Sequence, residues 1–557
     1  MRYVLAVTRT GASAPAGRKD RARAWRLAAF ASFCILLTVL HTWPLAAAPH
    51  RYSRVDNGDF LLNAWAVAWV SHQVTTDPAH LFDANIFWPE RRTLAYSEAM
   101  IVQGVLALPI TALGGSPVLA YNLVMLAGFA STAFFFGLVA RRWTGSWAAA
   151  AVTASAAGFS AHLLMRLGQL QAMHVEFVAV VLFAIDLVFS RQRIRDALLL
   201  AAGFVLQSLT SVYLMVFTVW AMFYAAATRM ASAAAAARKR AIVLLAIAAV
   251  VSVALLAFYL NAYRQLHAEQ GFARSAVETR ALAATWADYL STGSRLHYRW
   301  SRPFTEVCNS MNFPGFTVLA LVIAGLASAR VRRSPQAQMC LGVAAGCALT
   351  SFGPRVPGYE VVHHWIPLFW AVRAQAHLGQ IVLLALALLA GYGVLVLRRR
   401  WGTRRGWFVV AAALVVLVNA ESLRAPIGWR VFDGIPAVYD VLARQPAGAV
   451  VELPMYERRA LYGNASYMLN STRHWKPLLN GYSGFIPASY QEAWSRMRAF
   501  PGFDSLELLH ERDVRYVVIH RDRFVGMYGP AAFDAIAGTA SLSELASDGD
   551  IHLFRFR

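Results

Sequence analysis

Long apolar runs alternate with short polar loops along most of the chain. Many of these runs approach the ~20 residues that an α-helix needs to cross the hydrocarbon core of a membrane. Eleven runs predict transmembrane helices, at 27–47, 117–140, 146–164, 174–190, 196–211, 213–229, 241–261, 313–330, 338–352, 378–397 and 407–424. The expected fold is therefore an all-α polytopic membrane protein of about eleven transmembrane helices.

One further apolar stretch, 99–113, is short and contains Gln103 and Pro109. If it crossed the membrane, the Arg141-Arg142 pair and most later basic loops would lie on the external side. If it lies in the interface or enters only halfway, every basic cluster faces the cytoplasm, as the positive-inside rule requires. We therefore expect an interfacial or half-inserted helix, with the amino terminus in the cytoplasm and the carboxyl terminus outside.

Composition supports a membrane location. Hydrophobic residues make up 58% of the chain and charged residues 15%, against roughly 25% charged in a soluble protein. The formal charge of +22 would also suit a nucleic-acid partner, but the basic residues cluster in short loops, at 18–23, 141–142, 191–195, 238–240, 330–333 and 398–405. Membrane topology accounts for that pattern, so we expect membrane lipids and no nucleic acid as partners. The predicted location is the cytoplasmic (inner) membrane of a bacterial cell.

Three polar regions are expected on the external side. Two are the loops 48–116 and 262–312 of a membrane domain spanning 27–424, and the third is the tail 425–557. The basic segment 1–26 precedes the first helix in the cytoplasm. In the tail, 449–453 and 514–519 have the pattern of short buried strands, and 489–500 has helical spacing. This predicts a small external α/β domain, whose default role is recognition or support.

The polar segment Asp56-Asn57-Gly58-Asp59 follows the first apolar run. Two carboxylates three residues apart at a membrane surface suggest chemistry on a lipid-borne substrate. The alternative is structural, since Asp and Asn are favoured helix caps and Asp-Asn-Gly-Asp also suits a turn. After this segment, 60–74 is expected to form a helix in the headgroup plane. The residues on its membrane face would be Leu61, Trp65, Ala68, Trp69 and His72.

Further candidates lie in the same external loops. Arg91 and Arg92 lie outside the membrane, where guanidinium groups suit phosphate oxygens, although solvated loop arginines are the alternative. Glu98 is either a favourable charge at a helix amino terminus or a site carboxylate.

Polar groups also gather at two later external turns. We expect Arg166, Gln169 and His174 to bind substrate or phosphate, because ionisable groups at membrane depth are functional candidates. Arg373 is a candidate donor to a diphosphate, and a snorkelling anchor is the alternative.

Several of these features together resemble the GT-C fold glycosyltransferases, which include the protein mannosyltransferases and the aminoarabinose transferases. The resemblance covers about 25–230. It is carried by the Asp56-Asn57-Gly58-Asp59 motif, the interfacial helices after it, the cytoplasmic turn Arg141-Arg142-Trp143-Thr144-Gly145-Ser146, and a span ending in Phe159-Ser160 before Arg166.

The resemblance implies an external-loop Asp that acts as base, or coordinates a divalent cation such as Mg²⁺ or Mn²⁺, while an acceptor attacks a polyprenyl-phosphate sugar. By position, that role falls first to Asp59 and second to Asp56. The segment Tyr96-Ser97-Glu98-Ala99 departs from the mannosyltransferase pattern, which has a basic or His residue followed by two prolines there. The resemblance therefore leaves the donor sugar open.

The predicted activity is glycosyl transfer to a glycan, lipid or protein acceptor. No nucleotide sugars exist outside the cytoplasm, so a transferase there needs a lipid-carried donor. Its phosphate leaving group needs cationic stabilisation, and the acceptor hydroxyl needs a carboxylate base. Two alternatives remain. A transporter or flippase of lipid-linked sugars would tend to have internal repeats and midplane polar residues, and a non-catalytic assembly protein would use the tail to recruit partners.

Overall fold

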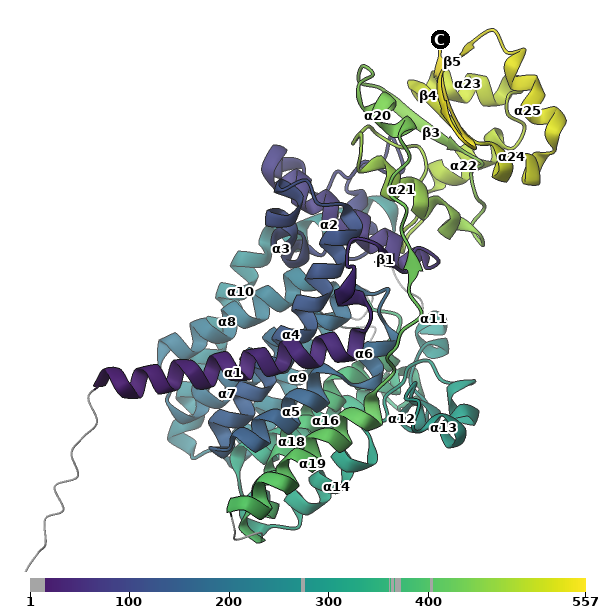
Figure 1. The fold of residues 1–557 in the computed structure, drawn as a ribbon. Coiled ribbons are helices and arrows are strands. Elements are labelled where there is room, and N and C mark those ends of the chain that lie inside the picture. Colours follow the sequence, from purple (N-terminus) through teal and green to yellow (C-terminus); the bar gives the residue numbers. More distant parts are fainter. Residues whose placement is uncertain (1–15, 272–275, 360, 362–364, 366–371, 401–403) are drawn as a thin grey trace, which may run out of the picture.

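The computed structural model describes residues 16–271, 276–359, 361, 365, 372–400 and 404–557. A slanted helical bundle occupies most of the molecule, and a smaller sheet-containing region lies at one end of it (Figure 1). Each of the eleven predicted apolar runs overlaps a helix of the bundle. These helices are α1 (Ala16–Thr42), α4 (Pro117–Thr144), α5 (Trp147–Gly158) with α6 (Ala161–Met165), α7 (Glu176–Ser190), α8 (Ile194–Thr210), α9 (Val212–Ser232), α10 (Ala235–Gln270), α14 (Phe316–Leu326), α16 (Pro335–Ser351), α18 (Gly379–Arg400) and α19 (Arg404–Ser422).

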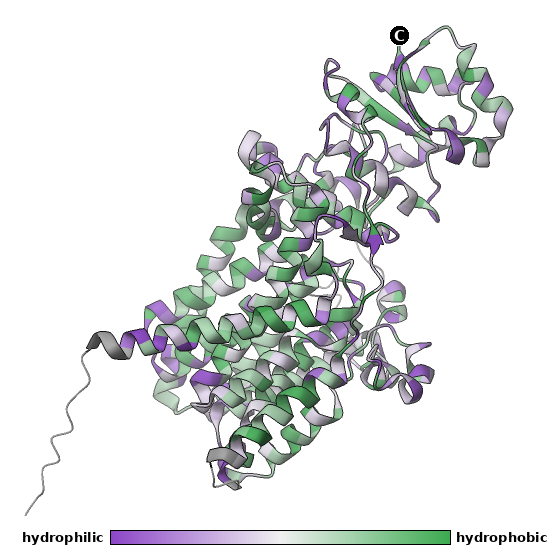
Figure 2. Ribbon diagram, viewed as in Figure 1, coloured by the Kyte–Doolittle hydropathy of each residue, from purple (hydrophilic) through white to green (hydrophobic). Residues whose placement is uncertain are grey.

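The chain is a multi-pass membrane protein. Within the described residues, six helices are long and apolar enough to cross a membrane, at Asp20–Thr42, Pro117–Thr144, Trp147–Met165, Val212–Ser232, Ala235–Gln270 and Gln375–Arg399. Apolar residues dominate the bundle, and hydrophilic residues gather toward its ends (Figure 2). Other helices are shorter than a bilayer is thick. The 11 residues of α14, for example, extend about 16 Å. The count of eleven spans therefore stays a prediction.

The ambiguous stretch 99–113 forms α3 (Ile101–Ala112), a helix of 12 residues. It is about 18 Å long, against the ~30 Å of the hydrocarbon core, so it cannot span unaided. Val105, Leu106 and Leu113 are exposed on or directly after it, which leaves an apolar face for lipid.

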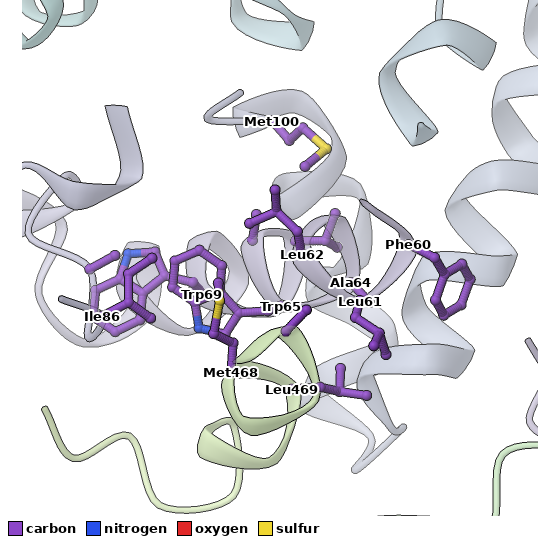
Figure 3. Packing of buried hydrophobic residues seen from close by; sticks show 14 of the residues in the cluster. Phe60, Leu61, Leu62, Ala64, Trp65, Trp69, Ile86, Met100, Met468 and Leu469 are labelled. Carbon is purple, nitrogen blue, oxygen red and sulfur yellow. The ribbon is translucent and has the colours of Figure 1, made fainter. Parts of the chain in front are cut away.

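The segment after the acidic motif forms α2 (Gly58–Thr76), as predicted, but its surroundings differ from the prediction. Trp65 and Trp69 are only 1% and 5% exposed, so they do not face lipid headgroups. Helix α21 (Ala465–Ser471) from the carboxyl-terminal region covers this face, with Met468 beside the two indoles and Leu469 beside Leu61 (Figure 3). The prediction that Trp65 and Trp69 face lipid headgroups is therefore wrong, because a distant segment buries this apolar face.

The carboxyl-terminal region contains a four-stranded sheet of order β3-β4-β6-β5. Its strands are β3 (Ala449–Leu453), β4 (Val514–His520), β5 (Leu542–Asp548) and β6 (Ile551–Phe556). β3 and β4 pair in parallel, and the other two pairs are antiparallel. Both strands predicted from the sequence are therefore present. The helices around the sheet are α20 (Val438–Ala443), α21, α22 (Ala488–Met497), α23 (Phe503–Glu511), α24 (Arg521–Tyr528) and α25 (Pro530–Ala537).

The two long loops lie at the end of the bundle that carries the carboxyl-terminal region. The strand β1 (Tyr52–Ser53) of the first loop pairs with β2 (Arg430–Val431), which leads into the carboxyl-terminal region. In its described residues, the loop between α10 and α14 contains three short helices, α11 (Ala276–Ala281), α12 (Trp286–Leu290) and α13 (Tyr298–Thr305). Residues that are hundreds of positions apart thus meet beside the amino end of α2.

Candidate functional site

A cavity of about 190 Å³ lies between the amino end of α2, the loop after α6, the start of α9 and the carboxyl-terminal region. Asp59, Arg166 and Arg373 all line it, although they come from three distant parts of the chain. The other polar side chains in its wall are Asn63, Ser97, Glu98, Gln169, Gln171, Ser211, Tyr213, His377, Gln380, Tyr482 and Ser483. One carboxylate and two guanidinium groups among the candidate residues therefore converge on one cavity, and Asp56 is not part of its wall.

Asp59 lies in the first turn of α2 with its carboxylate in the cavity wall. The cap of this helix is Asn57, whose side chain accepts a hydrogen bond from the Phe60 amide at 3.1 Å. The Asp59 side chain is thus not needed as the cap. It accepts hydrogen bonds from the Tyr482 hydroxyl at 2.8 Å and the Gln169 amide at 3.3 Å. Two donors on different segments fix the orientation of this carboxylate.

Tyr482 was not found from the sequence. Burial and the neighbouring Asp59 carboxylate raise the pKa of Tyr482 well above its usual value, so the phenol stays protonated and donates a hydrogen bond to Asp59. The residue comes more than 400 positions later in the chain. Nothing in its local sequence distinguishes it from other tyrosines.

Arg166 follows α6 and contacts both Gln169 and His162. Its Nε donates to the Gln169 carbonyl, and its Nη1 lies 3.2 Å from His162 Nε2. Gln169 therefore connects the guanidinium to Asp59, because its carbonyl accepts from one and its amide donates to the other. Burial lowers the pKa of Arg166 to about 10, against the opposing effect of Tyr213 and two carboxylates. The side chain is still a cation at neutral pH.

Arg373 approaches the cavity from the segment before α18. Its Nη1 lies 2.9 Å from a carboxylate oxygen of Glu278 on α11, and its backbone amide donates to the Tyr213 hydroxyl at 3.3 Å. The side chain is 42% exposed, so it can contact a ligand. Glu278 was also not anticipated from the sequence.

Glu98 lines the cavity and also caps the start of α9. Its carboxylate accepts from the Ser211 hydroxyl at 3.0 Å and from the amides of Val212 and Tyr213 at 2.8 and 3.4 Å. Burial raises the pKa of Glu98, while these hydrogen bonds and the Arg166 charge oppose the rise. The sequence left two roles open, a charge at the amino terminus of the 99–113 helix and a site carboxylate. The Glu98 carboxylate lines the cavity, and the helix whose amino terminus it contacts is α9 and not α3.

Four predicted site residues lie away from this cavity, and three of them are on the surface loops. Asp56 is exposed and pairs with Arg54 and Arg430, at 3.1 and 3.6 Å. Arg91 is exposed, and Arg92 pairs with Glu269 of α10. Asp56 and Arg92 therefore connect separate segments of the fold.

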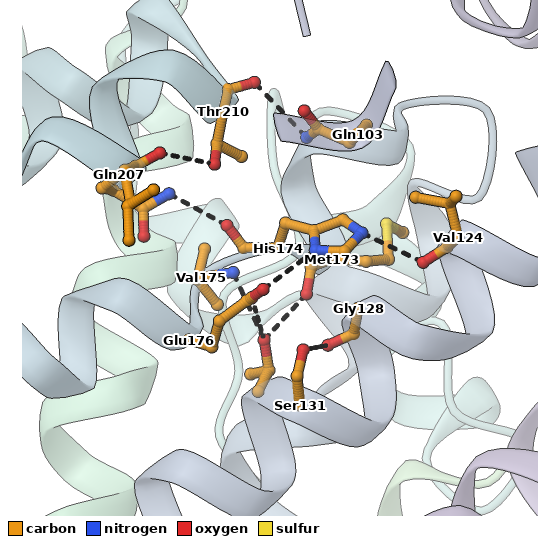
Figure 4. A network of polar contacts seen from close by, with 12 residues as sticks. Gln103, Val124, Gly128, Ser131, Met173, His174, Val175, Glu176, Gln207 and Thr210 are labelled. Carbon is orange, nitrogen blue, oxygen red and sulfur yellow. Dashed lines mark hydrogen bonds and ion pairs between the residues drawn. The ribbon is translucent and has the colours of Figure 1, made fainter. Parts of the chain in front are cut away.

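His174 is the fourth, and it is part of a buried polar network between α4, α7 and α8 (Figure 4). Its Nδ1 lies 3.0 Å from Glu176 and its Nε2 lies 3.0 Å from the Val124 carbonyl. The ring also fills the space beside Gly128, where a Cβ atom would lie 2.8 Å from it. His174 thus packs the bundle below the site.

A second cavity, of about 290 Å³, adjoins the first and shares Asp59, Arg166, Gln169 and His377 with it. Its other wall is the segment that follows α13. Ser310 in that segment lies 3.1 Å from His162 and 3.3 Å from His377. The carboxylate of Asp59 therefore lies between two spaces.

The described residues around Asp59 contain no preformed set of three metal ligands. Within the described part of the chain, no group of three or more His, Cys, Asp or Glu side chains could hold a metal ion. The Asp59 oxygens accept from Tyr482 and Gln169, and the Glu98 oxygens accept from the start of α9. Asp56, the other proposed ligand, lines neither of the two cavities.

No protein-family model and no curated protein sequence matches the chain. Among solved structures, the arabinofuranosyltransferase AftD from Mycobacteria matches with a TM-score of 0.60 and 15% identity over 96% of this chain. The match covers 40% of AftD, so this chain spans less than half the length of that protein. ArnT from Cupriavidus metallidurans has a TM-score of 0.49 and 14% identity, over 96% of this chain and 98% of ArnT. The oligosaccharyltransferase AglB from Archaeoglobus fulgidus has a TM-score of 0.49 and 10% identity, over 90% and 70%. The chain has the GT-C fold, as the sequence resemblance indicated.

Proposed function

We propose that the chain is an integral membrane glycosyltransferase that moves a sugar from a polyprenyl-phosphate-linked donor to an acceptor on the external side of the membrane. The convergence of Asp59, Arg166 and Arg373 on one cavity carries the proposal. A carboxylate base and two fixed cations are the groups that transfer from a lipid phosphate requires.

In the proposed reaction, Asp59 accepts the proton of an acceptor hydroxyl while that oxygen attacks the anomeric carbon of the donor sugar. The bond from this carbon to the phosphate oxygen breaks, and polyprenyl phosphate leaves with the electron pair. Arg166 and Arg373 stabilise the negative charge that develops on the phosphate. The two cavities that meet at Asp59 would hold donor and acceptor on either side of the carboxylate.

The proposed topology has eleven spans, the amino terminus in the bacterial cytoplasm, and 425–557 as an external α/β domain. The positions of the basic loops support this orientation. The site then lies on the external side, where a lipid must carry the donor sugar. Since the AftD neighbour is by name an arabinofuranosyltransferase, a pentose is one donor to test.

Turnover by the purified chain in proteoliposomes tests the proposal. The donors are polyprenyl phosphates carrying arabinofuranose, mannose or aminoarabinose, and the acceptors are glycan, lipid A and protein fractions of a bacterial envelope. We expect release of free polyprenyl phosphate that depends on both donor and acceptor. A scaffold would release none with any combination, and a flippase would move the donor across the bilayer without cleaving it.

We expect transfer to continue after removal of divalent cations. The oxygens of Asp59 and Glu98 accept hydrogen bonds from protein donors, and two guanidinium groups supply the positive charge. Rates measured in EDTA should therefore stay within about twofold of the untreated rates, because the preorganised cations remain in place. A loss of tenfold or more that Mg²⁺ or Mn²⁺ restores would contradict this assignment and favour cation coordination by Asp59.

A further inference from the structure

A third cavity, of about 600 Å³, lies between the carboxyl half of α2, the α3–α4 turn and the carboxyl-terminal region. It shares no lining residue with the two cavities at Asp59. Its wall combines two aromatic rings, several hydroxyl groups and one charged pair, among them His72, Trp475, Thr75, Thr111, Asp440 and Arg473. The proposed transfer reaction uses none of them.

Two aromatic rings form a rigid part of this wall. The His72 ring stacks on Trp475 with centroids 4.4 Å apart and an angle of 7°, and Trp69 meets Trp475 edge-on at 5.8 Å. Trp475 has φ of +55°, a left-handed conformation that is rare for such a residue and is enriched at ligand clamps. Packing against α2 holds the indole in this position.

The charged side chains that line the third cavity neutralise each other. Asp440 and Arg473 pair with each other, and burial lowers the pKa of His72, so its ring is neutral at pH 7. An anionic headgroup would find no uncommitted cation among the lining residues. The Asp59 cavity differs, because Arg166 lines it and donates to the neutral side chain of Gln169 and not to a carboxylate. The third cavity therefore suits an uncharged ligand that combines an apolar face with many hydroxyl groups.

We propose that this cavity is a second glycan-binding site, which holds neutral sugar units away from the site of transfer. The C–H face of a sugar ring packs on an aromatic face, and its hydroxyls bond to Ser, Thr, Asp and Arg side chains. His72 lies thirteen residues after Asp59 on the same helix, a rise of about 20 Å. A ligand at one site therefore leaves the other free, and binding here needs no turnover at Asp59.

Binding of neutral hexasaccharides tests the inference. The full chain in phosphatidylcholine nanodiscs is titrated with linear hexasaccharides of arabinofuranose, mannose or glucose, by calorimetry and saturation-transfer NMR. We expect at least one to bind, and Trp475→Ala to weaken binding tenfold or more. Because that indole also packs on α2, the double variant Asp440→Asn/Arg473→Gln at the exposed rim provides a second measurement, with at least a fivefold loss expected.

Two control variants match these changes. Trp286→Ala removes an exposed indole, and Arg302→Gln/Glu306→Gln removes an exposed ion pair, both away from the cavity. Neither should change the affinity. Asp59→Asn should also bind the sugar normally, which separates this inference from the proposed transfer. The inference would be overturned if no hexasaccharide bound, or if both cavity variants bound with the affinity of the parent chain. Displacement of the sugar by inorganic phosphate or phosphatidylglycerol would also overturn it.

Discussion

Replacing Asp59 with Asn should lower the rate of sugar transfer by about 10²–10⁴-fold, the range expected for loss of a general base. Asn has nearly the same shape and can still accept a hydrogen bond from the Tyr482 hydroxyl, which now lies 2.8 Å from the carboxylate. It cannot take a proton from the acceptor. The variant should therefore fold and bind donor normally, and the loss should appear in kcat.

Asp56→Asn is the matched control, since it makes the same chemical change three residues earlier. Asp56 is exposed and pairs with Arg54 and Arg430, so the variant should keep transfer within about twofold of the parent. Both rates are measured in proteoliposomes, alongside thermal unfolding of each variant. Full activity of a folded Asp59→Asn variant would remove Asp59 as the base. A large loss in the Asp56 variant alone would move the role to that residue.

Much of the fold follows from the apolar runs, because a membrane imposes a length and polarity on every crossing segment. Helices overlap all eleven predicted runs, and the short, mostly apolar run that becomes β3 is recognisable as a buried strand. The environment of α2 does not follow from its own pattern. An apolar face with Trp65 and Trp69 suits lipid or protein equally well, and α21, about 400 residues later, covers it.

The site shows a similar division. Asp59, Arg166 and Arg373 could be proposed together because polar residues on one side of a membrane share a confined surface. The side of the membrane on which a residue lies does not determine the direction of its side chain. Arg92 and His174 share that predicted side, yet they pair with other groups.

Tyr482 and Glu278 could not be predicted from the sequence, because only tertiary contacts bring them to the site. Tyr482 becomes a partner of Asp59 because the carboxyl-terminal region packs on the amino end of α2. Glu278 reaches Arg373 through the fold of the loop between α10 and α14. Single tyrosines and glutamates are common in polar loops, so no local pattern separates these two from the rest.

Replacing Arg166 with Gln should lower kcat/KM for the lipid-linked donor by about 10²–10³-fold, the loss expected when one preorganised donor to a developing oxyanion is removed. The guanidinium lines both cavities at Asp59 and is a cation at neutral pH. Arg166→Lys keeps a charge but cannot donate to a phosphate and to Gln169 with the same planar geometry. It should recover only part of the activity. Steady-state kinetics with varied donor concentration measure both effects.

Arg166 also holds Gln169 and contacts His162, so a loss of activity could reflect a displaced loop. Arg373→Gln separates the two causes, because Arg373 is more exposed and pairs with Glu278 on another segment. It should also weaken transfer, with a larger rise in KM for the donor. Arg91→Gln is the matched control, since it removes an exposed guanidinium outside both cavities, and its rate should stay within about twofold. If Arg166→Gln and Arg373→Gln both fold and turn over at the parent rate, the guanidinium groups do not stabilise the leaving phosphate, and the assignment of this cavity to a lipid phosphate fails with them.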